Sequence, residues 1–153
     1  MSQRKSYTRW THHCGSRVSW LLMATPDHVD GSSPVSVRAS GRPGIPGWFT
    51  PEQVKSWRPI VSSVHDRGGF FFAQLWHQGR NTHSFLTGQQ PESSCAVGLS
   101  GSLTCTTVPS LPFETPKAMT KEEISATQMD FVQAAINAVS AGCDGIEIHA
   151  GNG

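Results

Sequence analysis

Two short segments, each directly after a capped helix, constrain the fold of this chain more than any other feature. The first is the apolar run Phe70–Trp76 (FFFAQLW), and the second is residues 145–149 (GIEIH), which has the pattern of a short strand. A continuous apolar run such as the first is typical of a strand in a parallel sheet, where other elements cover both faces. The order helix, strand, helix, strand therefore predicts an α/β fold, because right-handed crossovers place such strands side by side in one parallel sheet.

The first helix is expected to begin after Thr50. Pro51 suits the first helical position, and Gln53 completes a capping-box spacing with Thr50. Pro59 falls inside the helix, where proline removes a hydrogen bond at a cost of about 3 kcal/mol, so a kink or break is expected there. Gly68 and the glycine after it end the helix. The predicted apolar face comprises Val54, Trp57, Val61 and Val64.

The second helix is expected to begin after Thr120, with Glu123 at the third position of another capping box. Gly142 follows the last apolar position and is a typical C-terminal cap. Helical periodicity predicts one apolar face for packing against the sheet. The face comprises Ile124, Phe131, Ala135 and Val139, broadened by Val132 and Ile136.

The rest of the chain shows weaker patterns. Residues 77–119 are rich in Ser, Thr, Gly and Pro and are expected to form an irregular loop, which at that length is usually functional or disordered. Residues 1–34 show no sustained periodicity, so we expect a divergent, disordered start. The predicted domain is then residues 35–153. With 153 residues, the chain is too short for a complete eight-fold α/β barrel, which needs about 250.

Composition excludes several classes of function. The net charge of +1 gives no reason to expect a nucleic-acid partner. No apolar run approaches the roughly 20 residues of a membrane-spanning helix. A cytoplasmic location with reduced thiols is expected, although a Cys95–Cys105 disulfide is sterically conceivable. The first 26 residues contain no acidic residue, which leaves a mitochondrial presequence as the alternative location.

No metal site is expected. The segment His12-His13-Cys14 holds potential ligands, but no second ligand cluster lies at a usable spacing. The glycines near the second strand do not form the G-x-G-x-x-G pattern of a dinucleotide fold.

Polar residues at the ends of the two strands are the candidate site. Gln74 lies near the end of the first strand, while His149 and Asn152 follow the second. In parallel α/β barrels the reactive groups lie at the carboxyl ends of strands. The Gln74 amide suits the imide edge of a flavin or a nucleobase, and His149 and Asn152 can donate hydrogen bonds to a carbonyl oxygen. Taken alone, a glutamine at a strand end such as Gln74 is more often a loop contact than a ligand-binding group, and His149 is as often structural as functional.

Four segments resemble the Old Yellow Enzyme family of flavin-dependent ene-reductases in the order of that family. They are residues 43–57, 72–80 (FAQLWHQGR), 116–123 and 141–149 (AGCDGIEIH), and the resemblance extends over roughly residues 35–153. It implies part of a (β/α)₈ TIM barrel, with about three strands and their helices.

The resemblance also implies a chemistry. The cofactor would be FMN, reduced by NAD(P)H, and the substrate a small enone or unsaturated aldehyde. Gln74 would hydrogen-bond the pyrimidine end of the flavin. His149 and Asn152 would hold the substrate carbonyl oxygen and so polarise the alkene.

The sequence departs from the family pattern in several places. Gly151 stands where the family has Ala, and the Tyr that donates a proton would come after Gly153. The Pro-Leu-Thr segment of the first strand, the flavin-proximal Arg and the phosphate-binding amides of later strands are not found. We therefore expect an inactive remnant of a fungal ene-reductase, of the kind used in ergot-type alkaloid formation. The alternatives are a non-catalytic interaction protein and an active enzyme of which these residues are only a part.

Overall fold

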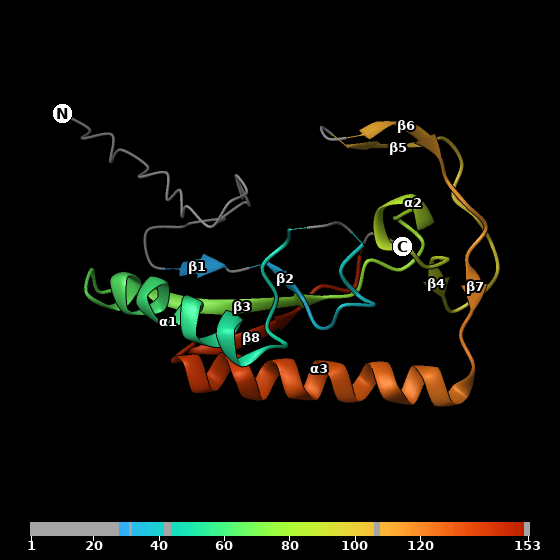
Figure 1. Ribbon diagram of the computed structural model, residues 1–153. Helices are drawn as coiled ribbons and strands as arrows, with labels where there is room; N and C mark the ends of the chain where they lie inside the picture. The colour runs from blue at the N-terminus through green and yellow to red at the C-terminus, as the bar shows by residue number, and fades with distance from the viewer. Residues whose placement is uncertain (1–27, 31, 42–43, 106–107, 152–153) are drawn as a thin grey trace.

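The computed structural model describes residues 28–30, 32–41, 44–105 and 108–151 (Figure 1). Its main sheet contains β1 (His28–Asp30), β2 (Ser33–Pro34), β3 (Phe70–Trp76) and β8 (Gly145–Ile148). All pairings are parallel: β1 and β2 pair with the two halves of β3 along one edge, and β8 pairs with the other edge. The sheet thus has three strand positions with β3 in the centre, which confirms the predicted α/β arrangement.

Strands β1 and β2 lie inside the segment 1–34 that was expected to be irregular, so that expectation is wrong for these short stretches. Each strand has only two or three residues, too few to show an alternating sequence pattern. These residues form strands because they pair with β3. The preceding residues, including His12, His13, Cys14 and the presequence candidate, lie outside the described residues.

Helix α1 (Pro51–His65) begins with the predicted capping box. The Thr50 hydroxyl accepts a hydrogen bond from the Gln53 amide, and the Gln53 side chain accepts one from the Thr50 amide. The helix continues through Pro59, so the predicted break does not occur. Pro59 lies on the solvent-exposed side, where water can bond the carbonyl that loses its partner.

Helix α3 (Lys121–Ala141) also begins with its predicted capping box, and Gly142 ends it with a φ of 105°. The predicted core face is only partly correct. Ala134, Ala138 and Ala141 are buried, whereas the larger residues Val132, Ile136 and Val139 are about half exposed or more. Small side chains let α3 approach the sheet closely, and the bulkier residues lie on another side of the helix.

The core lies between one face of the sheet and the two helices. From β3 it includes Phe71, Ala73 and Leu75, each at most 1% exposed. The side chains of Trp48 and Trp57 stack with ring centroids 4.7 Å apart, and Trp57 also contacts Phe71. We call this the helix-covered face; Phe70 on the other face is 55% exposed. The predicted burial of β3 on both faces is therefore correct for only one.

The segment 77–119 is more ordered than the sequence predicted. It contains α2 (Ser84–Thr87), β4 (Glu92–Ser93), β5 (Ser102–Cys105), β6 (Val108–Pro112) and β7 (Lys117–Ala118). β5 and β6 form an antiparallel hairpin that lies apart from the main sheet, at the upper right of Figure 1. Among the described residues, neither long helix is apolar enough to span a bilayer.

Candidate functional site

A row of three polar side chains crosses the sheet near the carboxyl ends of its strands. The Gln74 amide oxygen accepts a hydrogen bond from the Ser32 hydroxyl at 2.8 Å, and its amide nitrogen donates one to Glu147 Oε1 at 3.2 Å. Each residue comes from a different strand position: the β1–β2 edge, β3 and β8. Because both ends of the Gln74 amide are held, its plane has a defined orientation.

Strand alternation explains why this row lies on the open face of the sheet. Phe71, Ala73 and Leu75 point into the helix-covered core, so Gln74 points to the opposite face. Glu147 is in register with Gln74 across the β3–β8 pairing. Side chains at paired positions lie on the same face of a sheet. The carboxylate and the amide therefore meet on the face that would line the interior of a closed barrel.

Sequence reasoning identified Gln74 but missed Ser32 and Glu147. For Glu147 a signal was available, since it precedes His149 by two residues and strand alternation places both on one face. For Ser32 no signal existed in the sequence, because its role depends on the register of a two-residue strand with β3.

His149 follows β8 directly, and its backbone amide donates to the Leu75 carbonyl at 2.9 Å. This bond continues the β3–β8 pairing by one residue and brings His149 to the same edge as Gln74. A Cβ added at Gly151 would lie 3.4 Å from Cε1 and Nε2 of the His149 ring. The alanine of the family pattern would therefore pack against this ring, and glycine removes that contact. Asn152 lies outside the described residues.

Asp144 fixes the start of β8 against the start of β3. Its carboxylate accepts a hydrogen bond from the Phe71 amide at 2.8 Å and lies 2.7 Å from Nε2 of His65. The Asp144 amide in turn donates to the Phe71 carbonyl at 2.9 Å. The Phe71 hydrogen bond holds the pKa of the Asp144 carboxyl below its ordinary value, and His65 lowers it further. Asp144 therefore sets the register that brings Glu147 opposite Gln74.

Gly145 has a steric role at the same pairing. It lies opposite Phe72 in the β3–β8 register, and a Cβ added at Gly145 would lie only 2.4 Å from Cε1 of the Phe72 ring. The ring covers the glycine on the open face of the sheet. A side chain at position 145 would therefore displace Phe72 from its place beside the polar row.

Two other titratable groups next to these strands, Cys143 before β8 and His77 after β3, are not suited to catalysis. Burial raises the pKa of the Cys143 thiol to about 12, so the thiol stays protonated and unreactive. Burial also lowers the pKa of His77, whose Nδ1 accepts a hydrogen bond from the Gly79 amide at 2.9 Å. His77 thus orders the loop after β3 as a neutral ring. Within the described ranges, no group of three or more potential metal ligands occurs.

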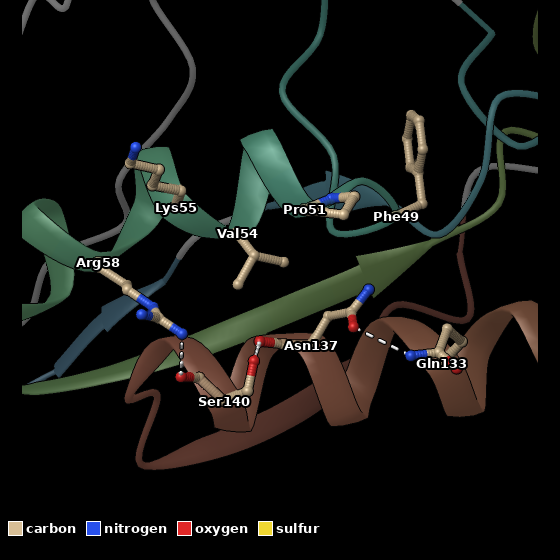
Figure 2. Close-up of a pocket in the computed structure, with 8 residues that line it drawn as sticks. All are labelled: Phe49, Pro51, Val54, Lys55, Arg58, Gln133, Asn137 and Ser140. Atoms are coloured by element: carbon tan, nitrogen blue, oxygen red, sulfur yellow. Dashed lines mark hydrogen bonds between the residues drawn. The ribbon is translucent and has the colours of Figure 1, made fainter.

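A groove of about 570 Å³ lies between α1 and α3 (Figure 2). It is lined by Phe49, Pro51, Val54, Lys55, Arg58, Gln133, Asn137 and Ser140. Arg58 bonds the Ser140 carbonyl at the end of α3, and Gln133 bonds Asn137. The Arg58 bond ties the two helices together. The groove lies on the helix side of the sheet, away from Gln74 and His149, so it is separate from the candidate site.

Three parallel strand positions with helices on one face are the arrangement found in part of a (β/α)₈ barrel. Residues 16–153 match the model of the NADH:flavin oxidoreductase / NADH oxidase family, and the chain belongs to this family. The match begins at residue 16; the predicted domain start at residue 35 stays a prediction. Members of the family use FMN, with NAD(P)H as the reductant.

Three relatives illustrate the likeness. The flavin oxidoreductase hxnT of Emericella nidulans is 40% identical over 124 residues, which are 80% of this chain and 31% of hxnT. The 12-oxophytodienoate reductase 2 of Arabidopsis thaliana is 39% identical over 130 residues, covering 78% of this chain and 32% of that protein. The solved Old Yellow Enzyme homologue of Zymomonas mobilis (NCR) aligns with a TM-score of 0.75 at 35% identity, covering 80% and 35% of the two chains.

The chain therefore spans about a third of the length of its relatives. The structural neighbour confirms that the fold is part of a TIM barrel, as the sequence predicted. The residues at the strand ends fit a flavin: the Gln74 amide offers a donor and an acceptor side by side, and Ser32 and Glu147 fix its plane.

Proposed function

We propose that this chain forms part of the active site of an FMN-dependent ene-reductase that acts on α,β-unsaturated carbonyl compounds. The observation that carries this proposal is the oriented Gln74 amide beside His149 at the carboxyl ends of neighbouring parallel strands. Family membership and the barrel fold support it. When bound, FMN reduced by NAD(P)H supplies the hydride.

In this proposal the residues of the chain bind and orient. Gln74 would hold the pyrimidine edge of the flavin, and Ser32 and Glu147 would keep its amide in the required plane. His149 and Asn152 would donate hydrogen bonds to the substrate carbonyl oxygen, where negative charge develops as the alkene is reduced. Such donors polarise the double bond and make its β-carbon an acceptor for hydride.

We further propose that the 153-residue chain on its own does not catalyse the reduction. The face of the sheet that carries Gln74 is open, with Phe70 and Glu147 exposed to solvent, and an open site leaves water around the reacting groups. An origin in fungal alkaloid formation rests on sequence resemblance alone and stays a prediction.

A segment exchange tests the active-site proposal. Residues 28–153 of this chain, which include Asn152, would replace the matching segment of the Zymomonas mobilis homologue, and reduction of 2-cyclohexenone by NADPH would be measured. We expect activity in the exchanged protein, a loss of about 100-fold in kcat/KM with His149→Ala, and weaker FMN binding with Gln74→Leu. Gln133→Ala, on the exposed polar side of α3, is the control and should retain FMN.

Two results would contradict the proposal. A folded exchanged protein that binds FMN but gives no reduction would show that these residues do not support the chemistry. Unchanged kinetics with His149→Ala would show that His149 does not make the proposed contact with the substrate. The separate claim of inactivity is tested with the 153-residue chain itself, because robust alkene-dependent NADPH oxidation by that chain would disprove it.

A further inference from the structure

The groove between α1 and α3, which we call the α1–α3 groove, has the size of a small-molecule site (Figure 2). Its volume of about 570 Å³ falls within the range of roughly 300–1,000 Å³ that is typical of ligand pockets. Its walls are the two long helices and the turn before α1, all of them described residues. The groove is separate from the polar row with Gln74, and the proposed function leaves it unused.

The α3 wall of the groove is polar and is held in place by its own hydrogen bonds. Gln133, Asn137 and Ser140 are four and three residues apart, which places them along one side of α3. Asn137 Nδ2 donates a hydrogen bond to the Trp48 carbonyl at 2.6 Å, and Asn137 Oδ1 accepts one from Gln133 Nε2 at 3.0 Å. A ligand therefore meets a preorganised wall rather than side chains that it must first order.

The α1 wall carries positive charge that no carboxylate compensates. Lys55 and Arg58 line the groove, and none of its eight lining residues is acidic. Each ion pair among the described residues involves a cation other than these two. Arg58 makes one long hydrogen bond, from Nη2 to the Ser140 carbonyl at 3.5 Å, so most of its five N–H donors remain available. Such a guanidinium favours an anion, because a carboxylate can accept two parallel N–H bonds from it.

The side chains in Figure 2 indicate where an anion and an apolar group would lie. Arg58 extends across the gap toward α3, whereas Lys55 points away from α3, so Arg58 is the direct anion contact and Lys55 adds charge at the rim. Val54 also points toward α3 and lies four residues before Arg58, about 6 Å along the helix axis. This separation is about the length of a molecule with a ring on Val54 and a carboxylate on Arg58.

We propose that the α1–α3 groove binds a small organic anion, an aromatic carboxylate, with its carboxylate on Arg58 and its ring against Val54. The two contacts support each other, since an exposed ion pair alone contributes little in water and a ring displaces water from beside it. Phe49 and Pro51 extend the apolar part of the lining. This binding does not depend on whether the chain takes part in hydride transfer.

Titration of the 153-residue chain with phenylacetate tests the proposal. Binding would be followed by ¹H–¹⁵N NMR, which reports the side-chain amides of Gln133 and Asn137 directly. We expect a saturable shift of these signals with a Kd of about 1 mM, as is usual for a ligand of this size. Arg58→Gln should weaken binding by about 10-fold or more. Arg67→Gln removes the same charge outside the groove and should change the Kd by less than about 2-fold.

Two related probes separate the parts of the site. Phenylacetamide keeps the ring without the charge, and acetate keeps the charge without the ring. Both should bind at least about 10-fold more weakly than phenylacetate, because each lacks one of the two contacts. These comparisons use the unaltered chain, so they decide the matter even where Arg58→Gln does not fold.

Four outcomes would overturn the proposal. The first is no saturable shift with phenylacetate, and the second is an equal response to acetate, which would mean unspecific ion pairing only. The third is unchanged binding in a folded Arg58→Gln variant. The fourth is a set of shifts centred on Gln74 and His149 instead of Gln133 and Asn137, which would assign the ligand to the open face of the sheet. FMN binding and alkene reduction in the exchanged protein are measured separately, so failure of this proposal is distinguishable from failure of the proposed function.

Discussion

The two faces of β3 differ sharply in burial. Phe71 points into the helix-covered core and is fully buried, while the adjacent Phe70 points to the open face and is 55% exposed. Burial of apolar area stabilises the fold by about 25 cal/mol per Å², so most of the stability comes from one face. The polar row with Gln74 lies on the other. In this chain, stability and candidate chemistry are therefore separated by strand alternation.

The largest expected effect comes from truncating the same residue type on each face. Phe71→Ala should lower the free energy of unfolding by about 3–5 kcal/mol, because it opens a cavity against Trp57. Phe70→Ala, the matched control, should cost less than about 1 kcal/mol because the ring is already half in water. Urea unfolding followed by tryptophan fluorescence measures both. Equal losses would mean that the open face is as well packed as the core.

A smaller effect is expected where Asp144 links β8 to β3. Asp144→Ala should cost about 1.5 kcal/mol, the low end for a charged hydrogen bond, since the carboxylate is partly exposed and screened. The pKa of Asp144 is lowered in the folded protein, chiefly by the Phe71 amide. The contribution of the ionised Asp144 carboxylate to the free energy of unfolding is therefore present above the unfolded pKa of about 3.9. It is lost as the pH falls through the lower folded value.

Unfolding measured between pH 7 and pH 3 checks this pH dependence. The stability difference between the wild type and Asp144→Asn should be constant near neutral pH and shrink below about pH 4. A difference that grows as the pH falls would have the wrong sign and would remove the assigned role of the Asp144 charge.

The N-terminus of α3 gives the next smaller effect. Thr120 accepts a hydrogen bond from the Glu123 amide, so Thr120→Ala should cost about 1 kcal/mol. Thr120→Ser keeps the hydroxyl and should stay close to the wild type. Thermal unfolding by circular dichroism measures both variants. If serine destabilises as much as alanine, the hydroxyl hydrogen bond is not the source of the effect.

The smallest effect on stability is expected in the polar row itself. Gln74→Ala and Glu147→Ala should each change the free energy of unfolding by no more than about 0.5 kcal/mol, because the row faces solvent. The same urea titration measures them. A loss above about 2 kcal/mol would show that the polar row contributes to stability as core residues do. It would contradict the assignment of stability to one face of β3 and of the candidate chemistry to the other.

Local patterns predicted the regular elements well. β3 spans the predicted Phe70–Trp76, and the capping boxes at Thr50 and Thr120 begin the two long helices. These features depend on residues within a few positions of each other, so the sequence contains their whole cause. The candidate Gln74 and the strand before His149 were found for the same reason.

Features that depend on distant residues could not be predicted in the same way. The core face of α3 was predicted only in part. Phe131 and Ala135 pack against the core as expected, but Val132, Ile136 and Val139 are exposed, because the close approach to the sheet selects alanines. The hairpin β5–β6 was missed because its strands show no alternating apolar pattern in the sequence. They form because they pair with each other.

The sequence by itself determined the two long helices, the strands β3 and β8, their parallel arrangement, and the family to which the chain belongs. Only the tertiary structure decided that Ser32 and Glu147 hold the Gln74 amide, because that arrangement depends on the register of three strands far apart in the chain. It also decided which side of α3 packs on the sheet, since the side of a helix that is covered depends on what packs beside it.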